Sequence, residues 1–189
     1  MNKLSSFTFL TLNGFYKGLN EDISWHKHRS DEEEADFSAD SLKADNMLLF
    51  GRVTYEMMIK WWPTAAAIES MPEVANGMNK AEKIVFSKSL KKADWNNTRI
   101  IREDIINEIK KLKKEGKKNM TILGSGSILT QFAEEGLIDE YSIMIDPLAI
   151  GKGTPLFKDI KQQLNLELAN TKTFKNGVIL LNYRPAKSK

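Results

Sequence analysis

The segment ILGSGSILTQF, from Ile122 to Phe132, joins an apolar run to an amphipathic stretch through two glycines and two serines. This pattern predicts a strand over residues 120–123, a tight turn, and a helix over residues 125–135. The free N–H groups and the positive dipole end of such a helix suit a phosphate, and glycine lets the phosphate approach the backbone. A purely structural strand-to-helix turn explains the segment equally well, so other segments must decide between the two.

The segment completes neither of the two common nucleotide-binding patterns. The dinucleotide fingerprint G-x-G-x-x-G needs a glycine where Leu129 stands, and it opens the first strand–helix unit, whereas this segment lies late in the chain. No Gly-Lys-Ser/Thr follows the turn, and GKGT at residues 151–154 does not open a helix after a strand. The sequence therefore argues against a Rossmann domain and against a P-loop protein.

The composition fits one globular domain over residues 1–189, with 41% hydrophobic and 28% charged residues. A net charge of +3 gives no reason to expect a nucleic-acid partner. The absence of cysteine excludes disulfides and thiolate sites. No apolar run approaches the roughly 18 residues that span a bilayer, and no signal peptide is recognisable, so we expect a cytoplasmic protein without a membrane partner.

Apolar runs alternate with helical patterns in the first two thirds of the chain, and strands follow one another at its end. This order predicts an α/β fold with a sheet that is parallel in its middle and antiparallel at one end. Asn176-Gly177 predicts a type I′ hairpin turn between the last two strands, and Ser30 with Glu33 forms a capping-box pattern at a helix start. The stretch 61–82 is weakly patterned. Strands are predicted at 7–12, 46–50, 83–87, 98–101, 120–123, 138–145, 166–174 and 178–183, and helices at about 31–43, 53–59, 103–115 and 125–135.

Two further strand ends carry residues suited to anions. LLFGRVTYE, from Leu48 to Glu56, repeats the strand, glycine and helix-start order, and it adds the guanidinium of Arg52 and the hydroxyl of Thr54. VFSKS, from Val85 to Ser89, ends a strand in serine and lysine, and Arg102 follows the next strand. Each feature alone fits a solvated surface, but two helix starts at one sheet edge can hold a pyrophosphate between them.

With these motifs the chain resembles the dihydrofolate reductase superfamily. The resemblance is strongest to the branch that contains the C-terminal reductase domain of the riboflavin-pathway bifunctional enzyme and its small stand-alone relatives. It runs in order from Phe7 to Tyr183 and rests on five segments: TLNGF, LLFGRVTYE, KIVFSKS, ILGSGSILTQF and LIDEYSIMIDPLAIGKGTPLF. No single segment is specific, whereas five in order with fitting spacing are.

The resemblance implies a dihydrofolate reductase-like α/β fold and an NADPH-dependent reductase that acts on a small heterocyclic or carbonyl-like substrate. The activity would be like that of 5-amino-6-(5-phosphoribosylamino)uracil reductase or of dihydrofolate reductase. The implied cofactor residues are Gly51, Arg52, Val53, Thr54, Gly124, Ser125, Gly126, Ser127 and Ile128 at the pyrophosphate, Ser87, Lys88 and Arg102 at the adenosine 2′-phosphate, and Leu12, Asn13 and Gly14 near the nicotinamide. In this superfamily the glycine-rich turn opens with a cis peptide, which predicts a cis bond between Gly124 and Ser125.

The acidic residues of the family are not all present. Asn13 stands where the family has an aspartate, and Gly124 stands where riboflavin-pathway reductases have a glutamate. Asp36 is the candidate for the folate reductases' buried helix carboxylate, although the run DEEEAD at 31–36 is also typical of a solvated helix start.

Four aromatic or histidine positions need a separate interpretation. Trp25 and Tyr55 are candidate substrate contacts, and packing explains both equally well. His26 and His28 lack the carboxylates that a metal site needs, so no metal is predicted.

These features support a homodimeric NADPH-dependent reductase as the first interpretation. The alternative is a nucleotide-binding or interaction protein that keeps the fold without the activity, which the missing acids favour. A flavin protein is the third interpretation.

Overall fold

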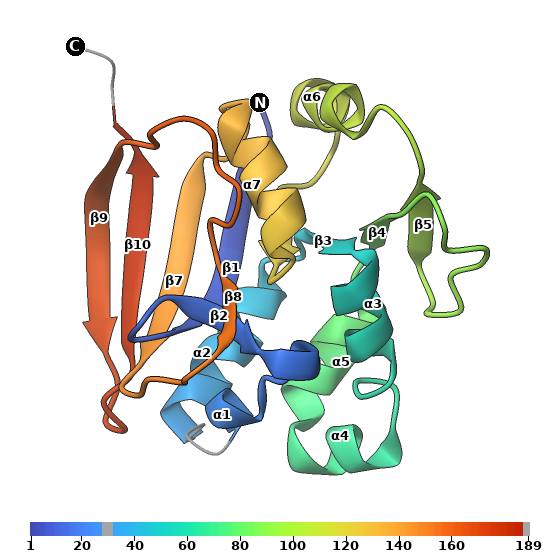
Figure 1. Cartoon of the computed structure of the whole chain (residues 1–189). Coiled ribbons are helices and arrows are strands. Elements are labelled where there is room, and N and C mark those ends of the chain that lie inside the picture. The colour runs from blue at the N-terminus through green and yellow to red at the C-terminus, as the bar shows by residue number, and fades with distance from the viewer. Residues whose placement is uncertain (28–31, 187–189) are drawn as a thin grey trace.

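A central sheet organises the computed structural model, which describes residues 1–27 and 32–186 (Figure 1). All neighbouring pairs from β5 to β7 are parallel, and β10 runs antiparallel to both β7 and β9. In spatial order the eight strands are β5 (Thr98–Ile101), β4 (Lys83–Phe86), β3 (Met47–Gly51), β6 (Met120–Leu123), β1 (Leu4–Thr11), β7 (Glu140–Asp146), β10 (Ile179–Pro185) and β9 (Leu166–Thr173). The predicted mostly parallel sheet with an antiparallel end is therefore confirmed.

Helices cover both faces of this sheet, and a two-stranded sheet lies beside it (Figure 1). The small sheet pairs β2 (Phe15–Gly18) with β8 (Gly153–Pro155) in antiparallel fashion. The helical elements are η1 (Leu19–Glu21), α1 (Ser24–Lys27), α2 (Glu32–Lys43), α3 (Arg52–Ile59), α4 (Ala65–Ser70), α5 (Pro72–Lys80), α6 (Ile105–Glu115) and α7 (Gly126–Glu134).

Alternating side chains of the central strands separate two cores. Leu49 of β3 packs with Ile109 of α6 and Phe132 of α7 on one face. Its neighbour Phe50 packs with Val74 of α5 on the other face, together with residues of α2 and α3. Successive residues of a strand point to opposite faces, so an apolar run such as MLLF fills both cores at once.

The weakly patterned stretch 61–82 folds as α4 and α5, which the sequence prediction missed. Its helices have six and nine residues, too short for a clear apolar stripe. Local signals were nevertheless present, because Thr64 caps the Ala67 N–H and Pro72 occupies the first turn of α5. The predicted N-cap Ser30 lies outside the described residues.

The turn between β9 and β10 differs from the predicted type I′ turn. Gly177 has a φ of +88°, but Asn176 is not among the residues with positive φ, and type I′ requires both. The Gly177 N–H donates to the Phe174 carbonyl and the Phe174 N–H to the Val178 carbonyl, which closes a longer loop with glycine at its end. The Asn176 side chain instead accepts from the Val178 N–H at 3.0 Å, as turn asparagines commonly do.

No helix in the described part of the chain is both long enough and apolar enough to span a membrane.

Lys83 is a buried charge that ties the strand β4 to the segments around it. The side chain is 1% exposed. Its Nζ donates to the carbonyls of Ala81 at 2.6 Å and of Asn79 and Asn96 at 3.1 Å, and it lies 4.6 Å from the ring centroid of Trp95. Burial lowers the pKa of Lys83 to about 8.

Replacing Lys83 by methionine should lower the free energy of unfolding at pH 7 by about 1–3 kcal/mol, because three carbonyls lose their donor. The folded protein releases the Lys83 proton at lower pH than the unfolded chain does. The stability of the wild type relative to Lys83→Met should therefore rise as the pH increases from about 8 to about 10.5. Urea unfolding at several pH values measures both effects, with the exposed Lys80→Met as control; an unchanged difference across this range contradicts the prediction.

Candidate functional site

A cavity of about 1070 Å³ lies on the sheet face that carries α2 and α5. The ends of β3, β4 and β6 and the start of α3 line one part of it, and α1, α2 and α5 line another. Because the carboxyl ends of parallel strands meet at one sheet edge, the loops predicted to bind an anion converge there. The predicted cofactor residues that line the cavity are Gly51, Arg52, Val53, Thr54, Ser87, Lys88, Gly124, Ser125, Ser127 and Ile128.

Ser125 connects the two glycine turns directly. Its Oγ accepts a hydrogen bond from the Gly51 N–H at 2.9 Å and donates to the Leu123 carbonyl at 3.0 Å. The side chain is buried, and the residue has a φ of +56°. This bond brings the start of α3 against the start of α7, two segments that are 74 residues apart in sequence.

The predicted cis peptide between Gly124 and Ser125 is wrong, because this bond is trans. The chain reverses here through two consecutive left-handed residues, Gly124 with a φ of +55° and Ser125 with a φ of +56°. Glycine adopts this conformation freely, and the two hydrogen bonds of the Ser125 side chain hold the second residue in it.

Both helices at this junction start without a side-chain cap. Gly51 and Ser125 are the N-cap residues of α3 and α7; Gly51 has no side chain, and the Ser125 side chain makes no bond to the first turn, whereas Thr64 caps α4. The N–H groups of a first turn have no acceptor within their own helix. In α7 the Ile128 and Leu129 N–H groups bond to the Ser125 carbonyl, which leaves those of Gly126 and Ser127 without an acceptor among the described residues.

Gly126 does not line the cavity itself, but its lack of a side chain has a visible reason. A Cβ at this position would lie 2.9 Å from two ring atoms of Tyr16. The Tyr16 ring therefore packs directly on the first turn of α7, and it also lines the cavity. A larger residue would push this ring away.

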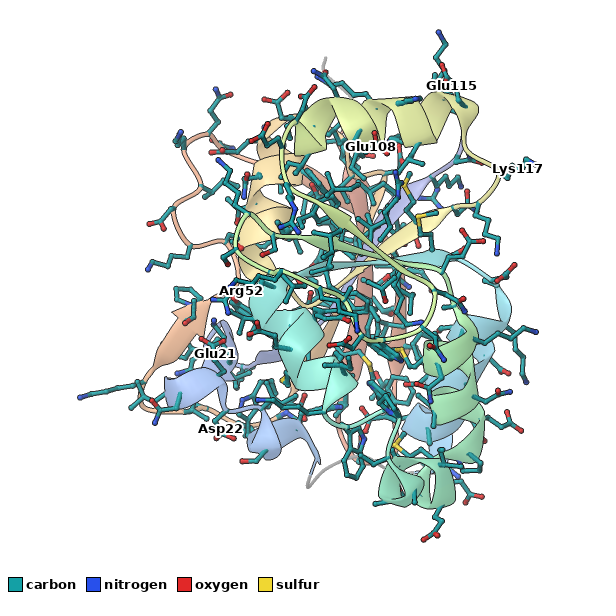
Figure 2. All side chains as sticks on the ribbon, turned by 90° about the vertical axis from the view of Figure 1, so that its right-hand side faces the viewer. Glu21, Asp22, Arg52, Glu108, Glu115 and Lys117 are labelled. Carbon is teal, nitrogen blue, oxygen red and sulfur yellow. The ribbon has the colours of Figure 1, made fainter. Side chains whose placement is uncertain are left out.

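The two cations near the starts of α3 and α7, Arg52 and Lys88, differ in whether a carboxylate binds them. The Arg52 guanidinium bonds to both carboxylate oxygens of Glu56, at 3.0 and 2.9 Å, one turn further along α3. The exposed Lys88 makes no ion pair or hydrogen bond to any residue that the structure describes. Figure 2 shows Arg52 at the start of α3 on the flank that also carries Glu21, another cavity residue, whereas Glu108 and Glu115 lie away on α6.

Arg102 supports the Lys88 loop rather than lining the cavity. Its Nη1 donates to the Leu90 carbonyl at 2.7 Å and its Nη2 to the Lys91 carbonyl at 3.3 Å. The Ser87 Oγ accepts from the Ser89 and Leu90 N–H groups at 3.2 and 2.9 Å, which closes the loop from its other side.

The turn from Leu12 to Gly14 lies outside the cavity lining. Leu12 is 71% exposed. The Asn13 Nδ2 donates to the Ile150 carbonyl at 2.8 Å, and its Oδ1 accepts from the Thr11 hydroxyl at 2.9 Å. Asn13 thus fastens the end of β1 to the loop before β8, a structural task that an amide performs with its donor and acceptor together.

The structure does not bring the predicted catalytic and substrate residues to the cavity. Asp36 is exposed on α2 and points away, because it lies two positions from the cavity residue Glu34 and so about 200° around the helix. Tyr55 is 2% exposed in the core, where its hydroxyl accepts from the Trp95 N–H at 3.0 Å. Trp25 is also buried, with its ring against that of His26.

Glu34 is the helix carboxylate that sequence reasoning missed. It is 3% exposed, lines the cavity, and accepts a hydrogen bond from the Asn176 Nδ2 at 2.7 Å. The sequence analysis did not find Glu34, because nothing in the acidic run DEEEAD distinguishes the one carboxylate that faces inward. The spacing of Glu34 from Ser38 and Ser41, which also line the cavity, was the available signal.

An apolar wall completes the cavity on the side of α3 and α5. Its methionine and tryptophan side chains come from the end of α3, the following turn and α5: Met57, Met58, Trp61, Trp62, Met71 and Met78. Such a wall suits a flat apolar molecule, because methionine adapts its shape and aromatic rings stack. Among the described residues, no group of three or more potential metal ligands is present.

Replacing Ser125 by alanine should lower the free energy of unfolding by about 1–3 kcal/mol, because the partly buried Gly51 N–H loses its acceptor. The matched control is Ser127→Ala, which removes an exposed hydroxyl from the same turn and should change stability by less than about 0.5 kcal/mol. Chemical denaturation measures both variants. Equal stabilities would show that the Ser125 bond does not hold the two turns together.

Comparisons with known proteins agree with this geometry. The family model of the RibD C-terminal domain matches residues 2–180. The Bacillus subtilis (strain 168) protein YyaP, described as uncharacterized, is 33% identical over 174 residues, which cover 92% of this chain and 90% of YyaP.

Solved structures share the fold at low sequence identity. A putative riboflavin biosynthesis protein from Shewanella sp. PV-4 has a TM-score of 0.77 and 18% identity, over 98% of this chain and 99% of that chain. A diaminohydroxyphosphoribosylaminopyrimidine deaminase/5-amino-6-(5-phosphoribosylamino)uracil reductase from Thermotoga maritima has a TM-score of 0.65 and 15% identity, over 98% of this chain and 57% of that one. The chain therefore belongs to the RibD C-terminal domain family and has the dihydrofolate reductase-like fold.

Proposed function

We propose that this protein is an NADPH-dependent reductase that transfers a hydride to a small heterocyclic or carbonyl-like acceptor. The observation that carries this proposal is the junction of two uncapped helix starts, held together by the Gly51–Ser125 hydrogen bond at the rim of one large cavity. The family relationship supports the same activity, because the Thermotoga maritima protein of this fold is named as a reductase.

The junction fits the pyrophosphate of a dinucleotide. The free N–H groups of Gly126 and Ser127 on one side, and the first turn of α3 on the other, would donate to phosphate oxygens. Both helix dipoles present their positive ends there. When bound, the cofactor supplies a hydride at its nicotinamide, and the protein's part is to position it against the acceptor.

Lys88 and Ser87 would favour NADPH over NADH. Lys88 is exposed at the cavity and has no anionic partner among the residues described, so its charge is available to a 2′-phosphate. Ser87 uses its oxygen as an acceptor within the loop and retains its hydroxyl hydrogen for donation. Arg102 would contribute by fixing the backbone that carries both residues.

Glu34 and the apolar wall would form the acceptor half of the cavity. The wall would bind the flat face of the acceptor, and the buried Glu34 carboxylate would bind N–H groups at its edge. Glu34 takes this role in place of Asp36, which is exposed. A riboflavin-pathway-like pyrimidine and a pterin both have the required shape and edge.

Lys88→Ala should weaken NADPH binding about 10-fold and leave NADH binding within about twofold, because the lysine would contact only the extra phosphate. Fluorescence titration of both dinucleotides measures the two constants. Lys111→Ala, an exposed lysine on α6, is the matched control and should change neither. An equal loss for NADPH and NADH would contradict the assignment of Lys88, and absence of binding to either would reject the reductase.

Glu34→Gln should lower reduction of a flat acceptor at least about 10-fold and leave NADPH binding unchanged, because the neutral amide keeps the size of the side chain and loses its charge. The measurement is NADPH oxidation with an acceptor panel of 7,8-dihydropterin, dihydrofolate, a cyclic enone and a quinone. Asp36→Asn on the exposed face of α2 is the control. If NADPH binds and the wild type reduces none of these acceptors, the alternative of a nucleotide-binding protein without reductase activity gains support.

A further inference from the structure

His26 and Asp146 form a buried pair at the end of the sheet. The His26 Nδ1 lies 3.1 Å from the Asp146 Oδ2, and the two residues are 8% and 0% exposed. Asp146 is the last residue of β7, opposite Thr11 of β1, and His26 belongs to α1. The pair therefore joins β7 of the central sheet to the short helix α1.

Packing fixes the His26 ring in one orientation. The ring stacks on Phe9 of β1, with a centroid separation of 3.5 Å and an interplanar angle of 23°. The His26 backbone N–H donates to the Ile23 carbonyl at 3.1 Å. With Nδ1 held by Asp146, the other ring nitrogen, Nε2, makes no hydrogen bond to the residues described in the structure.

The second oxygen of Asp146, Oδ1, is also buried and has no hydrogen-bond partner among the described residues. A buried carboxylate with a single partner depends on that partner, because an unpaired buried charge is costly. The arrangement thus commits the Nδ1–H of His26 to Asp146 and leaves Nε2 as the ring atom that can exchange a proton.

His26 lines the same cavity as the two glycine turns. The other ionisable groups of the cavity lining are Tyr16, Lys17, Glu21, Glu34, Arg52, Lys88 and Glu140. Lys17 pairs with Glu21, Arg52 with Glu56, and Glu140 with Arg184. Phe9 and Trp25, which contact the ring directly, carry no charge. Among the described residues, Asp146 is therefore the one carboxylate that contacts the imidazole.

We propose that His26 is the proton donor of this site and that Asp146 is its positioning residue, an inference that rests on the proposed reductase function. The acceptor would gain a hydride at carbon from the nicotinamide, which is oxidised to NADP⁺. It would gain a proton at its heteroatom from the Nε2–H of His26, so that this N–H bond breaks as the new O–H or N–H bond forms. After this transfer the ring is neutral and carries its one remaining N–H hydrogen on Nδ1. Water then returns a proton to Nε2.

NMR of the ring nitrogens tests the orientation without any acceptor. The sequence contains two histidines, so the variant His28→Gln assigns the signals. The neutral His26 ring should carry its hydrogen on Nδ1 in the wild type and lose this preference in Asp146→Ala, which removes the acceptor. A neutral ring with its hydrogen on Nε2 in the wild type overturns the proposal.

Kinetics with the acceptor panel test the proton transfer. His26→Gln should lower the rate at least about 100-fold with NADPH affinity unchanged, because general acid catalysis contributes about 10²–10⁴. The wild-type rate should fall as the pH rises and the ring loses its proton. Asp146→Asn, which keeps an oxygen for the Nδ1–H, should move this fall to lower pH, because the imidazolium loses its counter-charge. If His26 had only a structural role, Asp146→Asn would alter the stability of the protein and leave the pH profile of the rate unchanged.

Asp139→Asn is the matched control, since Asp139 is paired with Lys113 outside the cavity and its loss should not move the pH profile. If His26→Gln fails to fold, the pH profile of Asp146→Asn decides alone. Turnover equal to the wild type in His26→Gln, an unmoved profile in Asp146→Asn, or NADPH binding without reduction of any acceptor each overturns the proposal. Failure of the wild type to bind NADPH instead rejects the proposed function itself.

Discussion

The site depends on one hydrogen bond, from the Gly51 N–H to the Ser125 Oγ. Because β3 and β6 are neighbours in the sheet, the turns that follow them meet at the same edge, and this bond fixes the contact. The same hydroxyl donates its hydrogen to the Leu123 carbonyl. Ser125 does not cap α7, and the N–H groups of Gly126 and Ser127 in the first turn of that helix remain available. A serine that caps its own helix would satisfy the donors that an anion needs.

The two halves of the cavity are built differently. Backbone groups at strand ends form the part suited to the dinucleotide, and the parallel sheet and the Ser125 side chain hold them in place. Side chains from α1, α2, α3 and α5 form the part suited to the acceptor, and they include Glu34, His26 and the methionine–tryptophan wall. In the comparisons the fold is retained at 18% and 15% sequence identity.

The sequence predicted the architecture and the family well, because the five segments of the resemblance occur in order along the chain. The strands at 98–101 and 120–123 also have the predicted bounds. It failed where the outcome depends on distant partners. The acidic run at 31–36 has no local feature that selects Glu34, whose inward position is set by packing against the sheet. His26 gains its partner from Asp146, 120 residues away, so no local pattern reveals the pair. The predicted cis peptide failed because the Ser125 side chain holds the turn in a left-handed trans form.

Arg102 lies apart from the junction of Gly51 and Ser125. It follows the edge strand β5, which pairs with β4 alone among the described strands, and it grips the carbonyls of Leu90 and Lys91 in the loop behind Lys88. The junction at Gly51 and Ser125 has no contact with this edge in any described hydrogen bond. On the proposed function, evolution can alter the choice between two dinucleotides by substitutions at the margin of the sheet, while the central grip on their shared diphosphate stays intact.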